Sequence, residues 1–222
     1  MTKSETLFFL QKNNLKIPKS FVFEINEFIR DKRKIIDDIV KEFKVSHNII
    51  VRSSSLSEDS SFQSLAGAFE SILNVNPKDL NLIEDSINKV IDSLDENPKN
   101  QILIQEMIND VDISGVVMTK VHDDGSPYYV INFDDKTGKT DSVTSGNSIN
   151  KTVYVYNGYR DEDFDNKSLL MIMKIVKKIE SIFKDVPLDI EFAKTNEDEV
   201  FILQSRPITT LKNWDLKSNQ LV

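Results

Sequence analysis

Alternating apolar and polar residues predict two adjacent strands in residues 187–206 (PLDIEFAKTNEDEVFILQSR). Because successive strand residues point to opposite faces of a sheet, Asp189 and Glu191 share one face of the first strand. Gln204 and Arg206 share a face of the second strand in the same way. The other face of the first strand is apolar and holds Leu188, Ile190 and Phe192.

A polar turn joins the two strands, and its position sets their register. If the chain folds back at Glu197 and Asp198, antiparallel pairing creates a face with two carboxylates, an amide and a guanidinium. Only two other residues share that face, Ala193 and Ile202. The predicted pairs are Glu191 with Gln204, Asp189 with Arg206, and Phe192 with Leu203.

Two explanations fit this polar face, and the residues alone leave both open. An antiparallel sheet often turns one face to solvent, which accounts for polar side chains without any chemistry. Alternatively, the spaced carboxylates supply oxygen ligands for a hard cation such as Mg²⁺. The neighbouring arginine has the planar fork that binds phosphate oxygens. The second explanation predicts a Mg²⁺-nucleotide site.

Helical and strand periods alternate along the rest of the chain. The apolar spacing predicts helices at residues 4–14, 26–43, 77–94 and 168–183, with Pro77 in the first turn of the third helix. Strands are predicted at SFVF, NIIVR, ILIQEMI, SGVVMTK, YYVINFD and TVYVYN. This order indicates an α/β (α+β) protein of two lobes, residues 1–100 and 101–210, with a ligand in the cleft between them and 211–222 as a tail or the start of a linker.

The serine-rich segment SSSLSEDSSFQSLAGAFESILNV interrupts this pattern. Its small residues leave backbone amides accessible, so the segment has the composition of a loop that folds over an anionic ligand. A flexible surface loop has the same composition. On composition alone, the flexible surface loop is the favoured interpretation.

Composition restricts the function further. The 222 residues carry a formal net charge of -8, which disfavours nucleic acid and anionic membranes as partners. The absence of cysteine excludes disulfides, thiolate metal sites and cysteine nucleophiles. His47 and His122 lie in unrelated contexts, so a histidine metal cluster is not expected. With no apolar run long enough for a signal peptide or a membrane span, we expect a soluble, cytoplasmic protein.

Four blocks of the sequence resemble a known family in the same order and spacing. They are VRSSSLSEDSSFQSLAGAFESILNV, IQEMINDVDISGVVMTK, TDSVTSG and PLDIEFAKTNEDEVFILQSRPIT. They are similar to the ATP-binding domain of phosphoenolpyruvate synthase and pyruvate phosphate dikinase, and the similarity extends from Lys3 to about Thr210. The resemblance implies the ATP-grasp fold, with ATP and Mg²⁺ as ligands.

The resemblance also implies roles for individual residues. Lys3 corresponds to the phosphate-binding lysine of a glycine-glycine-lysine motif, although Met1 and Thr2 replace the glycines. Arg52 corresponds to the arginine on the transferring phosphates, and Gly67 to the pivot of a loop that closes over the triphosphate. The residues bordering the adenine would be Gln105 and Met107.

The four polar residues of the hairpin correspond to the metal and phosphate residues of the family. Glu191 and Gln204 would bind Mg²⁺, with Asp189 as a second ligand or an orienting group. Arg206, together with Arg52 and Lys3, would stabilise the charge on the transferring phosphoryl group.

In this family the phosphate passes to a histidine on a separate swivelling domain and then to a small molecule. Neither histidine of this chain lies in such a context, so the partner domain is expected in the same longer chain or in trans. We favour a longer chain, because the segment after Thr210 resembles the start of a linker. The final acceptor stays open among pyruvate, an antibiotic hydroxyl as in rifampin phosphotransferases, and a glutamine amide as in capsule-modification kinases. A non-catalytic nucleotide-binding module that gates a partner protein is the alternative.

Overall fold

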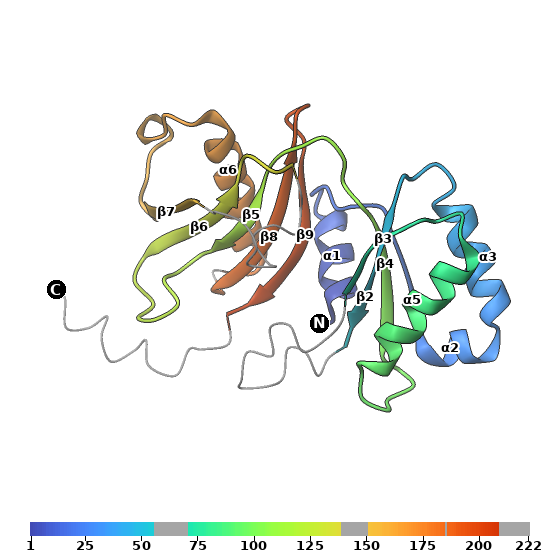
Figure 1. Cartoon of the computed structure of the whole chain (residues 1–222). Helices are drawn as coiled ribbons and strands as arrows, with labels where there is room; N and C mark the ends of the chain where they lie inside the picture. Colours follow the sequence, from blue (N-terminus) through green and yellow to red (C-terminus); the bar gives the residue numbers. More distant parts are fainter. Residues whose placement is uncertain (56–70, 139–150, 185, 209–222) are drawn as a thin grey trace. The chain divides into compact units, whose positions relative to one another are not determined.

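The computed structural model describes residues 1–55, 71–138, 151–184 and 186–208 (Figure 1). The chain divides into two compact units. Unit 1 contains Met1–Glu5 and Pro18–Met107, and unit 2 contains Thr6–Ile17 and Ile108–Val222. Helix α1 (Lys3–Lys12) therefore begins in unit 1 and continues in unit 2.

Unit 1 is built on a four-stranded sheet with the strand order β1-β4-β2-β3, in which every pair is antiparallel. The strands are β1 (Ser20–Glu24), β2 (Ile49–Ser54), β3 (Ser71–Val75) and β4 (Gln101–Glu106). Among its described residues, the helices that accompany them are α2 (Ile25–Arg30), α3 (Lys32–Glu42) and α5 (Leu80–Asp92).

The two faces of this sheet differ in chemistry. One face contributes Val51, Ile102 and Ile104 to a core that α3 and α5 complete with residues such as Ile39 and Ile87. The opposite face carries the side chains at the alternate positions of the same strands. On β2 and β4 these positions include Arg52, Ser54, Gln101 and Gln105.

Unit 2 is built on a five-stranded antiparallel sheet with the order β7-β6-β5-β8-β9. Its strands are β5 (Val111–Met118), β6 (Tyr128–Asp134), β7 (Lys151–Tyr156), β8 (Leu188–Thr195) and β9 (Val200–Pro207). Helix α6 (Lys167–Ile182) packs on β8, and a short 3-10 turn (Asp161–Asp163) precedes it. None of the helices described is long and apolar enough to span a membrane.

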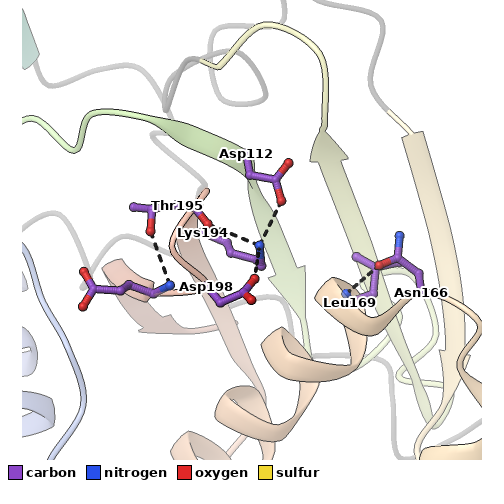
Figure 2. A network of polar contacts seen from close by, with 7 residues as sticks. Asp112, Asn166, Leu169, Lys194, Thr195 and Asp198 are labelled. Carbon is purple, nitrogen blue, oxygen red and sulfur yellow. Dashed lines mark hydrogen bonds and ion pairs between the residues drawn. The ribbon is translucent and has the colours of Figure 1, made fainter.

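Short polar side chains set where three helices begin. Asp31, Asp79 and Asn166 each accept a hydrogen bond from the backbone N–H three residues on, at the N-termini of α3, α5 and α6. These caps satisfy an amide that the helix itself leaves without an acceptor. Figure 2 shows the cap between Asn166 and Leu169, in which the N–H donates over 3.1 Å.

Gly115 allows β5 and β6 to approach each other in the middle of the unit 2 sheet. A Cβ atom at this position would lie 2.2 Å from the backbone oxygen of Asn132 and 2.8 Å from the Cα of Phe133. Both neighbours are backbone atoms, so a larger side chain would force the two strands apart. The glycine keeps β5 close to β6 and still paired with β8 on its other side.

The mixed helix and antiparallel-sheet organisation predicted from the sequence is confirmed, with three local corrections. The single helix predicted for residues 26–43 is two helices, because Asp31 ends α2 and caps α3. Pro77 precedes the third helix instead of lying in its first turn, since Asp79 is the N-cap of α5. Strand β3 was missed, because a long polar segment precedes it.

Candidate functional site in the β8–β9 hairpin

The β8–β9 hairpin has the predicted register at its catalytic candidates. Glu191 pairs with Gln204, and Asp189 pairs with Arg206. Residues 196–198 form the connecting turn, which Thr195 N–H closes by donating to the Glu199 carbonyl over 2.9 Å. The four polar residues therefore lie on one face of the hairpin.

Nearer the turn, the predicted register is wrong by one residue. Phe192 pairs with Ile202 and not with Leu203, because the register shifts between Glu191 and Phe192. Leu203 is thus an extra residue, as in a β-bulge. The bulge moves Ile202 to the apolar face, where it is buried.

Asp189 and Arg206 form an ion pair that uses only one carboxylate oxygen. The Arg206 Nε and one terminal nitrogen donate to Asp189 Oδ2 over 3.0 and 2.9 Å. The other oxygen, Oδ1, is buried and has no hydrogen-bond partner among the described residues. Burial raises the pKa of the Asp189 carboxyl, helped by the charge of Glu191 and opposed by Arg206 and His122. The Oδ1 atom of Asp189 can therefore accept a bond from a ligand.

Glu191 and Gln204 lie one pair further along the hairpin. The Gln204 side chain is buried, whereas Glu191 is half-buried. On the β5 side, Val116 pairs with Glu191 and Met118 with Asp189, so apolar side chains flank the carboxylates. Such surroundings limit solvation of the carboxylates and favour a cation that would compensate their charge.

The residues of this face fit Mg²⁺ if a nucleotide completes the coordination. No group of three or more histidine, cysteine, aspartate or glutamate residues in the described ranges could hold a metal ion alone. Mg²⁺ in nucleotide sites is commonly bound by one or two carboxylates, with phosphate oxygens and water as the other ligands. The orphaned Oδ1 of Asp189, the Glu191 carboxylate and the Gln204 amide oxygen match that donor set.

Two candidates from unit 1 meet on one face of its sheet. Arg52 of β2 donates from a terminal nitrogen to the Gln105 side-chain oxygen of β4 over 3.3 Å. Gln105 is buried and also lies 3.5 Å from the Ser20 hydroxyl. The structure therefore places the predicted phosphate arginine directly beside one of the predicted adenine-bordering residues.

The structure gives less information about the three remaining candidates, Lys3, Met107 and Gly67. Lys3 is the first residue of α1 and is half-buried. Met107 follows β4, donates its N–H to the Asn48 carbonyl over 3.0 Å, and accepts at sulfur from the Asn74 N–H over 3.3 Å. Gly67 and the closing loop predicted around it lie outside the described residues.

A second ion-pair network, which the sequence did not predict, occupies the turn end of the hairpin. Lys194 lies on the apolar face, where its ammonium contacts Asp198 at 2.7 Å and Asp112 at 2.9 Å (Figure 2). Asp112 is an extra residue in β5, where the pairing with β8 shifts register. A lysine at a position that alternates with Ile190 and Phe192 was the signal that could have revealed this network.

Comparisons with known proteins agree with this organisation. The family model of the pyruvate phosphate dikinase AMP/ATP-binding domain matches residues 16–134 and 132–220. The uncharacterized phosphotransferase YvkC of Bacillus subtilis (strain 168) is 23% identical over 282 residues, which cover 94% of this chain and 33% of that protein. The chain therefore spans about a third of the length of this relative.

Solved structures identify the fold. The VanG D-Ala:D-Ser ligase from Enterococcus faecalis superposes with a TM-score of 0.54 and 11% identity, over 95% of this chain and 54% of the ligase. PH1788 from Pyrococcus horikoshii Ot3 superposes with a TM-score of 0.57 and 13% identity, over 93% of this chain and 90% of that one. The predicted ATP-grasp fold is confirmed. With the family model matching most of its length, the chain belongs to the family of the pyruvate phosphate dikinase AMP/ATP-binding domain.

Proposed function

We propose that the chain binds ATP with Mg²⁺ and acts in phosphoryl transfer to a histidine on a separate domain, from which a small-molecule acceptor receives the phosphate. The buried Oδ1 of Asp189 is the observation that carries this proposal. A structural ion pair between two side chains gains most when both carboxylate oxygens have donors. Here one oxygen is left for a ligand, beside Glu191 and Gln204.

The residues would act by positioning and by charge. Asp189, Glu191 and Gln204 would hold Mg²⁺, which when bound neutralises charge on the phosphates. Arg206 would orient Asp189 through the two bonds that it donates to Oδ2, and its planar guanidinium would also contact a phosphate oxygen. Arg52 and Lys3 are proposed as further phosphate ligands. In the transfer step a phosphorus–oxygen bond of ATP breaks as a phosphorus–nitrogen bond to the histidine forms.

Thermal unfolding of the 222-residue chain with and without Mg²⁺-ATP tests the binding step. We expect ATP at about a hundredfold excess over its Kd to raise the Tm of the unmodified chain by about 5 °C. Glu191→Gln should abolish the increase, because it removes a charged metal ligand at nearly constant volume. Glu199→Gln is the matched control, since Glu199 lies on the same hairpin but pairs with Lys16. No increase for the unmodified chain at millimolar ATP would rule out the site.

Isotope transfer tests the chemical step. Labelled ATP is incubated with the full chain and a phosphohistidine domain of this family supplied in trans. Label on the histidine, lost in Glu191→Gln, would support the phosphotransferase, and subsequent loss of label to pyruvate, a hydroxyl compound or glutamine would identify the acceptor class. Binding of ATP without any transfer would favour the alternative, a nucleotide-binding module that gates a partner.

A further inference from the structure

The first turn of α1 carries a complete capping box. Glu5 donates its N–H to the Thr2 hydroxyl over 3.2 Å, and Thr2 donates its N–H to a Glu5 carboxylate oxygen over 2.9 Å. This is the reciprocal arrangement expected of a threonine at the N-cap with a glutamate three residues on. The box fixes Lys3 as the first residue of the helix.

A separate set of hydrogen bonds attaches this turn to the unit 1 sheet. Ser4 donates its N–H to the Ser54 hydroxyl over 3.1 Å and its own hydroxyl to the Gln101 side-chain oxygen over 2.7 Å. The Thr2 hydroxyl donates to the same oxygen over 3.1 Å. Ser54 ends β2 and Gln101 begins β4, and the two residues are paired. The turn is therefore held by two neighbouring strands.

These attachments are buried and polar, which a helix cap alone does not require. Thr2, Ser4 and Ser54 are 6%, 2% and 0% exposed. The capping box satisfies the N–H groups of Thr2 and Glu5, and Ser54 accepts from the Ser4 N–H, a helix donor that the box leaves open. The hydroxyl bonds to Gln101 satisfy no helix donor. An apolar contact would join the turn to the sheet without burying hydroxyls, each of which costs free energy to desolvate. Directional hydrogen bonds therefore fix the position of this turn on the sheet more closely than an apolar contact would.

Lys3 is the residue whose placement this network controls. Both of its covalent neighbours are fixed, so its Cα–Cβ direction is fixed as well. The anchoring face is also the one that bears Arg52, two residues before Ser54 on β2. Because a lysine side chain has many rotamers, holding its backbone limits the volume that its ammonium samples.

We propose that Thr2, Ser4, Ser54 and Gln101 are positioning residues that aim the Lys3 ammonium at an ATP phosphate. This inference rests on the proposed function. In the family motif, two glycines precede the lysine. In this chain, the side-chain hydrogen bonds would set the backbone geometry before Lys3 in their place. These four residues act through Lys3 and do not contact the nucleotide.

The test compares Mg²⁺-ATP affinity, measured by calorimetry, with thermal stability in the full chain. Ser54→Ala should weaken the affinity about fivefold, the effect of losing one positioning hydrogen bond. Ser86→Ala is the matched control, because Ser86 is equally buried and donates to the Leu82 carbonyl within α5. The control should leave the affinity unchanged, whatever its effect on Tm, because its hydroxyl bond lies within α5 and far in sequence from Lys3.

A double-mutant cycle separates positioning from general destabilisation. If Ser54 acts through Lys3, the Lys3→Met/Ser54→Ala double variant binds no more weakly than Lys3→Met alone. Additive losses, or an unchanged affinity in Ser54→Ala or Lys3→Met, would overturn the proposal. If Ser54→Ala does not fold, Thr2→Val and Thr2→Ser provide a second test. The valine variant lacks the hydroxyl and should bind Mg²⁺-ATP more weakly, whereas the serine variant retains the hydroxyl and should keep the affinity. A failure of the proposed function can be told apart from a failure of this positioning proposal, because in the first case the unmodified chain itself would not bind Mg²⁺-ATP.

Discussion

The two ends of the β8–β9 hairpin each bury a charged side chain, but they compensate its charge to different extents. At the turn end, the ammonium of Lys194 is 3% exposed and contacts Asp112, Asp198 and the Thr195 carbonyl. At the other end, Arg206 engages one oxygen of Asp189, and no other residue in the described part of the chain donates to the second oxygen. The buried charge of Lys194 therefore has anionic partners on two sides, whereas one buried oxygen of Asp189 is left for the ligand that we propose.

The pKa directions express the same difference. Burial lowers the pKa of Lys194, but its hydrogen bonds to Asp198 and Asp112 outweigh burial and raise it overall, so the ammonium is stabilised. At Asp189, burial raises the pKa and Arg206 does not outweigh it, so the carboxylate is under-compensated. The contacts of Lys194 favour its charged form, whereas the raised pKa of Asp189 agrees with the metal site proposed at that end of the hairpin.

The largest expected effect comes from removing both carboxylates at the turn end. In Asp112→Asn/Asp198→Asn the ammonium of Lys194 loses its anions. Because Asp112 and Asp198 are 41% and 67% exposed, solvent screens part of the pairing, and we expect unfolding to become easier by about 1–3 kcal/mol. Urea denaturation followed by circular dichroism measures the change. Adding Lys194→Met should recover most of the loss, because an apolar side chain then fills the same space.

The exposed pair between Lys174 and Asp161 offers the matched control for this experiment. Both side chains are more than half exposed, so Asp161→Asn should cost less than about 1 kcal/mol. If the double variant lost no more stability than this control, the turn end would not be a structural network.

A smaller effect is expected from pH. Because the folded-state pKa of Lys194 is raised above its ordinary value of 10.5, its contribution to stability is fully present below that value and is lost as pH rises through the folded-state pKa. As pH rises from about 9 to about 12, the unmodified chain should lose more stability than Lys194→Met. Parallel pH profiles for the two proteins would show that the ammonium contributes nothing.

The sequence predicted the open end of the hairpin better than the turn end. Alternation alone assigned the face of Asp189 and Glu191, and antiparallel pairing correctly placed Gln204 and Arg206 opposite them. It failed at Leu203, because a bulge inserts one residue without changing the local composition. The bulge that turns Asp112 toward Lys194 was hidden for the same reason.

The helices show a similar limit. The period of α6 identified a long amphipathic helix, since its buried residues Leu169, Ile172, Met173, Val176 and Ile179 recur at helical spacing. The same period continues across Asp31, where the chain ends one helix and caps the next. Periodicity reports which face is buried, and it does not report which backbone amide a short polar side chain accepts from. The capping box of Thr2 and Glu5 was readable in the sequence from its spacing.

The smallest change in stability, with a clear change in binding, is expected from Arg206→Lys at the open end. Lysine keeps the charge but lacks the planar fork, so it cannot reproduce both donors on Asp189 and also contact a phosphate. Arg206 is 37% exposed, so the free energy of unfolding should fall by less than about 1 kcal/mol. The Mg²⁺-ATP affinity should fall about tenfold, the usual worth of one charge-assisted hydrogen bond.

Arg160→Lys is the matched control for this variant, because Arg160 forms exposed ion pairs with Glu162 and Asp163. It should change neither stability nor affinity. Calorimetric titration and urea denaturation on the same samples separate the two quantities. A large loss of stability in Arg206→Lys with unchanged affinity would reverse the comparison, because the open end would then serve the fold, as the turn end does.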